Sequence, residues 1–279
     1  MTSITLRNRT LSWARRPLVM GILNVTPDSF SDGGLHISLD SAVDATARMV
    51  DDGVDVVDVG GESTRPGSEA VTVEEELDRV IPVIEAIRAR WDVPVSIDTM
   101  KSAVARAALS AGADMVNDVT AARHDDAMVD AVREVGAAVI LMHMRGEPKT
   151  MQEEIRFDDL MGEISAELRA ARDRVEARGV DRSRIFVDPG LGFGKTFDHN
   201  LEILACCEML AEIAPVVIGA SRKAFIGHLT GREAGPARMA GSLAAVAAAS
   251  EGRAAFVRVH DVGETVDFLA VTEAIRKAR

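Results

Sequence analysis

The stretch VDVVDVGGESTRPG, residues 54–67, shows the pattern that decides the fold. A short valine-rich run, residues 54–59, ends at two glycines and is followed by a polar loop. Such a nearly continuous apolar run is typical of a parallel strand covered on both faces. Seven further runs of this kind lie along the chain: Leu18–Val25, Pro94–Ile97, Asp114–Val119, Ala137–Met142, Ile185–Val187, Val216–Ala220 and Ala255–Val259.

The segments between the runs have helical periodicity. Apolar or small side chains at i, i+3, i+4 and i+7 predict amphipathic helices at both ends of the chain. They are Val43, Thr46, Ala47 and Val50 in the first helix, and Phe268, Val271, Thr272 and Ile275 in the last. Ser38 and Asp40 are expected to precede the first helix and Gly53 to follow it.

Eight alternations of strand and helix predict an α/β fold, a closed parallel (β/α)₈ TIM barrel. The alternative is an open doubly wound sheet, but no nucleotide fingerprint follows the first run. No repeat or linker divides the chain, so residues 1–279 are expected to form one domain. The residues before Pro17 are expected to form a small hairpin or lid.

The composition excludes several classes of function. The net charge of −12, the 4% of aromatic residues and the lack of tyrosine argue against nucleic-acid binding and against anionic membranes. No run reaches the ~18 apolar residues of a membrane helix. The cysteines, Cys206 and Cys207, are adjacent and form no disulfide framework. A cytoplasmic protein is expected.

Polar residues follow nearly every apolar run, where a TIM barrel builds its active site. They include Asn24, Asp98, Asn117, His143, Asp188, Lys223, Arg258 and His260. Any one of them could be a helix cap or a satisfied buried group, but their gathering at one end of the barrel favours a site.

These residues separate by chemical type. Asp98, Asn117 and Asp188 offer mainly acceptors, which suit the paired N–H donors of an amino-pyrimidinone ring. Arg65, Lys223, Arg258 and His260 suit a phosphate, which TIM barrels often bind near strands 7 and 8. A flat polar ring at the floor of the pocket and a phosphate at its rim are expected.

The sequence argues against two other kinds of site, a nucleotide-binding loop and a zinc site. GLGFGKT, residues 190–196, ends like a phosphate-binding loop, but the required leading glycine is Pro189, and the third glycine of a dinucleotide motif falls on Lys195. The six histidines lack zinc-ligand spacing. Mg²⁺ held mostly by phosphate oxygens fits better.

Eight motifs together resemble those of bacterial dihydropteroate synthase. In order they are MGILNVTPDSFSDGG, DVGGESTRPG, SIDT, VND, LMHMRGEPKTMQ, FVDPGLGFGKT, IGASRKAFIG and VRVHD, and the resemblance runs from about Leu18 to Val262. The resemblance implies a (β/α)₈ barrel that condenses 6-hydroxymethyl-7,8-dihydropterin diphosphate with p-aminobenzoate, giving dihydropteroate and diphosphate for folate synthesis. The family is the target of sulfonamides, which mimic p-aminobenzoate, and is usually homodimeric.

The resemblance also assigns roles to individual residues. It places Asp98, Asn117, Met142, Asp188, Phe193 and Lys223 around the pterin ring. It makes Asn24 the protein ligand of Mg²⁺, and it gives the diphosphate to Asn24, Arg258 and His260. It assigns the p-aminobenzoate pocket to Phe30, Thr64, Arg65, Pro66, Arg222 and the position of Ala224. Asp98, Lys223, Arg258 and His260 are the expected catalytic residues.

The chain departs from the family at Ala224, where many members carry a serine that helps to bind the p-aminobenzoate carboxylate. The backbone N–H of this residue at a helix start still suits a carboxylate. We expect somewhat weaker binding of p-aminobenzoate and no loss of function.

The electron-rich dihydropterin favours an SN1-like path, in which the protein needs no strong base. Arg258, His260 and Mg²⁺ are then expected to hold the leaving diphosphate, and Asp98 and Asp188 to stabilise the carbocation. The loops Thr26–Gly34 and Ser63–Gly67 are expected to close over the site and exclude water.

Three other functions fit the sequence less well. A pterin-dependent corrinoid methyltransferase has no use for the STRPG and SRK motifs. A Schiff-base aldolase would need an unprotonated Lys223, which the cationic surroundings disfavour. A catalytically idle pterin-binding paralogue would not need the full set of site residues. The small-residue stretch Met239–Ala249 suits either a dimer contact or ordinary packing on the barrel.

Overall fold

Eight parallel strands form the central sheet of the computed structural model, which describes residues 2–26, 39–63, 68–146 and 150–278. They are β3 (Leu18–Asn24), β4 (Val56–Gly60), β5 (Val95–Asp98), β6 (Met115–Asp118), β7 (Ala138–Met142), β8 (Ile185–Asp188), β9 (Val217–Ile218) and β10 (Phe256–Val259). Their order is β8-β7-β6-β5-β4-β3-β10-β9, and a parallel bridge between Val187 and Val216 joins the two edges. The predicted (β/α)₈ barrel is therefore confirmed.

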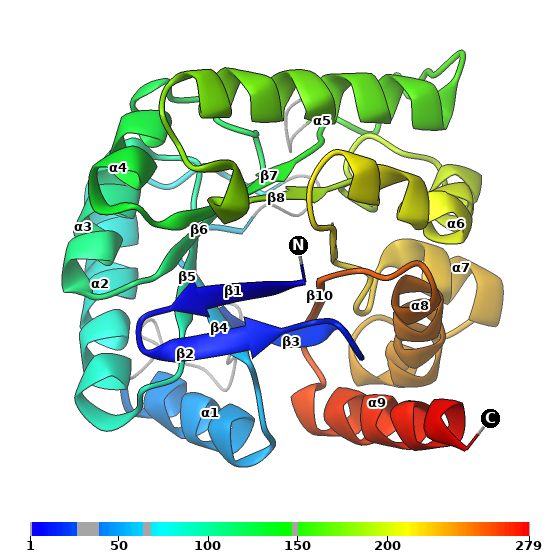
Figure 1. Cartoon of the computed structure of the whole chain (residues 1–279), viewed down its shortest axis with the longest axis horizontal. Coiled ribbons are helices and arrows are strands. Elements are labelled where there is room, and N and C mark those ends of the chain that lie inside the picture. The colour runs from blue at the N-terminus through cyan, green and yellow to red at the C-terminus, as the bar shows by residue number, and fades with distance from the viewer. Residues whose placement is uncertain (1, 27–38, 64–67, 147–149, 279) are drawn as a thin grey trace.

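Helices follow the strands and surround the sheet (Figure 1). They are α1 (Leu39–Asp51), α2 (Val73–Arg90), α3 (Ser102–Ala111), α4 (Ala127–Val135), α5 (Leu160–Ala177), α6 (Phe197–Cys206), α7 (Ala224–Thr230), α8 (Met239–Glu251) and α9 (Val262–Lys277), with short 3₁₀ turns at Arg182–Arg184, Cys207–Glu212 and Pro236–Arg238. A large apolar core fills the space between the sheet and these helices, which is why the strands are buried on both faces.

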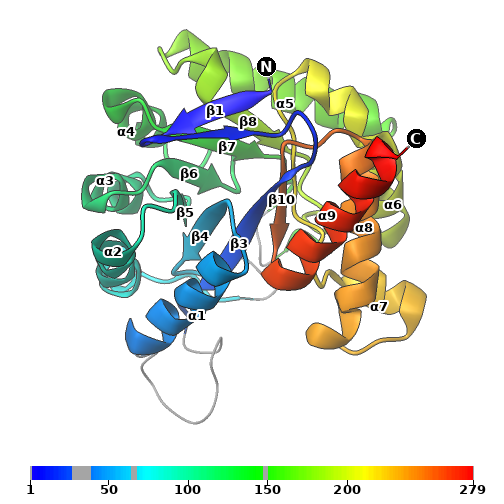
Figure 2. The same cartoon turned by 60° about the horizontal axis from the view of Figure 1, so that its bottom comes forward.

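The N-terminal residues form an antiparallel hairpin of β1 (Ser3–Leu6) and β2 (Arg9–Ser12), as the sequence led us to expect. The hairpin lies across one end of the barrel (Figures 1 and 2). The hairpin contacts residues that directly precede β8 and β6. Arg184 donates to the carbonyl of Thr5 at 2.7 Å, and Arg7 pairs with Asp114 at 3.1 Å. It therefore closes the N-terminal end and is not a lid over the C-terminal mouth.

Apolar side chains close the barrel below the mouth. Trp13, just after the hairpin, packs on Phe186 and Phe256, with ring centroids 5.8 and 6.5 Å away. The same cluster contains Met20 and Ile140 from the strands. The interior of the barrel is thus a packed apolar core at this end, and the polar ends of the strands lie at the opposite end.

Two details of the predicted helices are wrong. Half of the predicted face of α9 is exposed: Val271 and Ile275 are 61% and 54% exposed, whereas Phe268 packs against the core. The helix buries Val262 and Leu269 most fully. Only the first half of α9 packs closely against the barrel. The apolar spacing in its second half therefore does not indicate which side chains are buried. Asp40 lies inside the first turn of α1 and does not precede it.

Within the described residues, no helix is both long and apolar enough to cross a membrane.

Candidate active site

The interior of the barrel changes from apolar to polar along the strands. Met20, Val56 and Met115 are buried inside the barrel. Because every second side chain of a strand points to the same face, residues two or four positions further along the strands also face the barrel interior. Those later positions are Asn24 on β3, Asp58 on β4, Asp98 on β5, Asn117 on β6, Asp188 on β8 and Arg258 on β10. The carboxyl ends of the strands therefore form one polar floor.

Arg258 lies at the centre of this floor, between two carboxylates. Its Nε donates to Oδ2 of Asp58 at 2.6 Å, and its Nη2 donates to Oδ2 of Asp98 at 2.6 Å. The amide of Asn117 donates to the same oxygen of Asp58 at 3.3 Å. We expected cations above the acidic groups, and the structure places Arg258 among them.

Asp58 is a site residue that the sequence analysis missed. Its side chain is fully buried, and its Oδ1 has no hydrogen-bond partner within the described residues. A buried carboxylate oxygen without a donor is costly unless a ligand supplies one. The sequence contained a sign of this role, because Asp58 is a charged residue inside a valine run. It is two positions from Val56 and from Gly60, so it faces the barrel interior as they do.

Asp188 completes the acidic floor next to Arg258. Its Oδ1 accepts a hydrogen bond from the backbone N–H of Gly190 at 2.6 Å. Its Oδ2 and the Cβ of Arg258 lie on either side of Gly219, 3.8 and 4.0 Å from where a Cβ would stand there. Asp188 and Arg258 therefore both border Gly219, close enough for the charge of Arg258 to act on the carboxyl group.

Burial controls the protonation of the floor. It raises the pKa of Asp98 to about 7, against the opposing effect of Arg258. Burial also raises the pKa of Asp188. Burial alone would lower the pKa of Arg258, but Asp58 and Asp98 raise it above its usual value, so the guanidinium stays charged. The floor therefore holds a charged guanidinium next to Asp98, whose pKa of about 7 lies near neutral pH.

An apolar wall stands beside the floor. Met142 and Phe193, the two predicted wall residues, belong to one cluster with Val119, Met144, Met151 and Met100. The Nζ of Lys223 lies 4.3 Å from the centroid of the Phe193 ring, a cation–π contact. The structure thus brings the predicted wall and the predicted pterin-binding lysine together.

Asn24 lies at the edge of the floor, half-buried at the end of β3. Its amide oxygen is 3.8 Å, and an Asp98 carboxylate oxygen 3.7 Å, from where a Cβ of Gly60 would stand. The side-chain oxygens of Asn24 and Asp98 therefore both lie next to Gly60. No group of three or more His, Cys, Asp or Glu side chains suited to a metal occurs in the described ranges.

His260 and Arg222 lie near the rim of the barrel. The Nδ1 of His260 is 3.0 Å from the hydroxyl of Ser221. Arg222 has the left-handed φ of +58° and forms a two-point ion pair with Asp261, in which its Nε donates at 3.1 Å. Ala224 is exposed at the first position of α7.

Four of the predicted p-aminobenzoate residues lie outside the described residues. They are Phe30, Thr64, Arg65 and Pro66, together with most of the two loops expected to close over the site. Their placement stays a prediction.

Comparisons with known proteins agree with this geometry. The family described as pterin binding enzyme matches residues 20–260. The dihydropteroate synthase of Escherichia coli strain K12 is 48% identical over 269 residues, which cover 94% of this chain and 93% of that protein. A Yersinia pestis dihydropteroate synthase solved with a sulfonamide drug has a TM-score of 0.92 at 43% identity, with all of both chains covered. A Xanthomonas albilineans dihydropteroate synthase solved with 4-aminobenzoic acid has a TM-score of 0.92 at 46% identity, with 98% of both chains covered.

A barrel with an acidic floor and a match over nearly its whole length define a pterin-binding enzyme. Within that class the chain belongs to the dihydropteroate synthase family, and its function is that of a dihydropteroate synthase. The comparisons support this function and not the alternatives of an idle paralogue or a corrinoid methyltransferase.

Proposed function

We propose that the mouth of the barrel binds 6-hydroxymethyl-7,8-dihydropterin diphosphate and p-aminobenzoate and joins them to give 7,8-dihydropteroate and diphosphate. The observation that carries the proposal is the floor itself, where Asp58, Asp98 and Asp188 surround Arg258. The carboxylates accept hydrogen bonds from the N–H groups of the pterin edge, and the unpartnered Oδ1 of Asp58 suits one of those donors.

The apolar wall and Lys223 contact the pterin ring. Met142 and Phe193 pack against its faces, and the ammonium group of Lys223 donates to the ring carbonyl and a ring nitrogen. The position of this ammonium over the Phe193 ring supports both assignments.

The diphosphate is bound by Asn24, Arg258 and His260. Arg258 keeps its charge at the centre of the floor, so it balances the negative charge that develops on the departing diphosphate. The amide oxygen of Asn24 would suit Mg²⁺, a hard cation that proteins bind through one or two oxygens, with phosphate oxygens and waters as the other ligands. When bound, Mg²⁺ would neutralise charge on the leaving diphosphate.

The reaction proceeds by an SN1-like path. The C–O bond to the diphosphate breaks first, and the electron-rich dihydropterin ring stabilises the resulting cation. Asp98 and Asp188, buried beside the ring, stabilise the same positive charge. The amine of p-aminobenzoate then attacks the methylene carbon and loses a proton, so no strong base is required from the protein.

Release of diphosphate tests the proposed reaction. With both substrates present, the chain should release diphosphate and form dihydropteroate in a Mg²⁺-dependent manner, and EDTA should abolish the release. Equal release with and without EDTA would contradict the assigned role of Mg²⁺. Absence of dihydropteroate would contradict the proposed pair of substrates.

A second prediction concerns Ala224. Replacement by serine adds a hydroxyl at the start of α7, where the carboxylate of p-aminobenzoate is expected. A hydrogen bond to a charged partner contributes about 1.5–3 kcal/mol, so the KM for p-aminobenzoate should fall by about tenfold or more. Initial rates at varied p-aminobenzoate check this, and an unchanged KM would count against the assignment.

The p-aminobenzoate pocket is also the proposed site of sulfonamide binding, and the Yersinia pestis relative was solved with a sulfonamide drug. We further propose that the chain forms a homodimer through α8. Its inner face buries Ser242, Val246 and Ala249, and its other side leaves Ala240 and Ala244 exposed. Small side chains there allow close approach of a second helix.

A further inference from the structure

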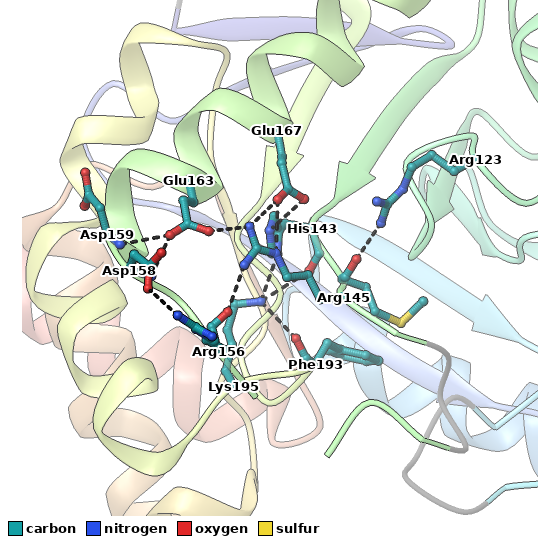
Figure 3. Close-up of polar contacts among 11 residues, drawn as sticks. Arg123, His143, Arg145, Arg156, Asp158, Asp159, Glu163, Glu167, Phe193 and Lys195 are labelled. Atoms are coloured by element: carbon teal, nitrogen blue, oxygen red, sulfur yellow. Dashed lines mark hydrogen bonds and ion pairs between the residues drawn. The ribbon is translucent and has the colours of Figure 1, made fainter. Parts of the chain in front are cut away.

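The segment GLGFGKT has a role in the structure that its sequence did not reveal. Lys195 is only 2% exposed, although lysine is rarely buried without a partner. It lies between the end of β7 and the loop after β8, next to His143 and Phe193 (Figure 3). No step of the proposed reaction uses it.

The ammonium group of Lys195 has three N–H donors and three acceptors within reach. Its Nζ is 3.0 Å from the carbonyl of Phe193, 3.0 Å from Nδ1 of His143 and 3.4 Å from the carbonyl of His143. This arrangement satisfies the charged form of the lysine. It also ties two loops together that come from neighbouring strands.

The histidine in this cluster is held in one tautomer. Its Nδ1 is 3.0 Å from the ammonium group of Lys195, which only donates hydrogen bonds, so Nδ1 is the acceptor. Its Nε2 is 3.2 Å from a carboxylate oxygen of Glu167, an electrostatic contact without hydrogen-bond geometry. The proton of neutral His143 therefore belongs on Nε2, and Nδ1 accepts from Lys195. Burial lowers the pKa of His143, which favours this neutral form.

The tie adds to other hydrogen bonds that fix the loop after β8, such as those of Gly192 with Asn200 at 2.6 Å and with Gln152 at 2.7 Å. Lys195 supplies the side-chain donor that reaches the carbonyl of Phe193. Gly190 and Gly194 have left-handed φ angles of +68° and +64°, and a Cβ at either would lie within 3 Å of a carbonyl oxygen of residues 143 or 145. The loop thus lies directly on the segment that follows β7. Phe193 in this loop also carries the ammonium group of Lys223 over its ring.

We propose that Lys195 is a positioning residue, which holds Phe193 by its carbonyl and thereby sets the wall of the pterin pocket and the place of Lys223. The inference rests on the proposed assignment of Phe193 and Lys223 to the pterin ring. Lys195 itself contacts neither substrate.

The tie should depend on pH. Burial lowers the pKa of Lys195 to about 7. The charged groups that face it are Asp188 from β8, Glu167 from α5, Arg145 from the segment after β7, and Lys223 from the loop before α7. Because the lowered pKa means loss of the proton as pH rises, the neutral amine lacks one donor above neutral pH, and the tie weakens there.

The test compares wild type with Lys195→Met, which keeps the length of the side chain and removes its donors. The dissociation constant of 6-hydroxymethylpterin should rise by about 10- to 100-fold, as for the loss of a hydrogen bond from a charged group. The KM for p-aminobenzoate should change by less than about threefold, because only one pocket is affected. In wild type, pterin affinity should fall between pH 6 and pH 9, and this fall should be absent from the variant.

Arg145→Met is the matched control. Arg145 lies in the same cluster and pairs with Glu163 and Glu167, and none of its side-chain hydrogen bonds reaches Phe193 (Figure 3). Pterin affinity should be retained in this variant. If Lys195→Met binds pterin as wild type does, or if both variants lose affinity equally, the proposal is overturned.

Two further measurements separate the possible failures. ¹⁵N NMR of the histidine rings in wild type should show His143 with its proton on Nε2, and the opposite tautomer would overturn the proposal even if the variant does not fold. If wild type binds no pterin at all, the proposed pterin site fails, and this outcome is distinct from failure of the Lys195 tie.

Discussion

Replacement of Asp98 by asparagine should lower kcat by about 100- to 1,000-fold, the range for removing one group that stabilises developing charge. Asparagine keeps the size and the hydrogen-bonding oxygen of the side chain, so pterin binding should change much less. The lost charge is the one that stabilises the carbocation beside the ring. Single-turnover measurement of C–O cleavage, with a separate pterin dissociation constant, distinguishes these effects.

The pH profile gives an independent control for Asp98. Burial raises the pKa of Asp98 to about 7, so its carboxylate form is lost as pH falls through that value. Wild-type kcat/KM should therefore decrease below about pH 7, and Asp98→Asn should lack this dependence. A change in KM alone, with kcat and the pH profile unaltered, would mean that Asp98 only recognises the ring.

Replacement of Arg258 by methionine should have the largest effect on stability. It leaves the carboxylates of Asp58 and Asp98 buried and facing one another, and breaking a buried ion pair by removing one partner costs about 3–5 kcal/mol. The free energy of unfolding, measured in urea, should fall by that amount. Diphosphate release should also be lost, since the cation at the floor is gone.

The loss of stability in Arg258→Met should depend on pH and on Asp58. Without the guanidinium, the pKa of Asp98 rises further, so the folded state binds protons more tightly and the variant is less unstable at pH 6 than at pH 8. The double variant Asp58→Asn, Arg258→Met contains one buried carboxylate less and should regain part of the lost stability. Equal stability of the single and double variants would contradict the described ion-pair network.

The barrel could be predicted because its strands are short apolar runs, and burial on both faces leaves a direct mark on composition. The face of α9 could not be predicted in the same way. Val271 and Ile275 have the right spacing but lie beyond the part of the helix that packs on β3, and hydrophobic spacing does not tell which turns of a helix meet the sheet. The hairpin was foreseen, but its place at the N-terminal end depends on long-range contacts such as Arg7 with Asp114.

The site was predictable where polar residues end a strand. Asp98, Asn117 and Asp188 were recognised on this basis, and they lie on one floor. Asp58 was missed because it lies inside a strand, where the run as a whole reads as apolar. Its importance comes from inward parity and from the guanidinium of Arg258, which lies 200 positions further along the chain.

Lys195 shows a different limit of sequence analysis. Its motif departs from a phosphate-binding loop at Pro189, and the pattern gives no sign that the lysine turns inward. Only the fold brings the end of β7 against the loop after β8, and this places His143 beside it. A buried lysine of this kind is recognised from its acceptors and not from its neighbours in sequence.

A crystal structure of the chain with 6-hydroxymethylpterin bound tests the central claim most directly. The polar edge of the ring should lie within hydrogen-bonding distance of Asp98, Asn117 and Asp188, with Lys223 at its carbonyl and Phe193 against its face. A pterin bound away from the carboxyl ends of the strands, with these carboxylates untouched, would contradict the account.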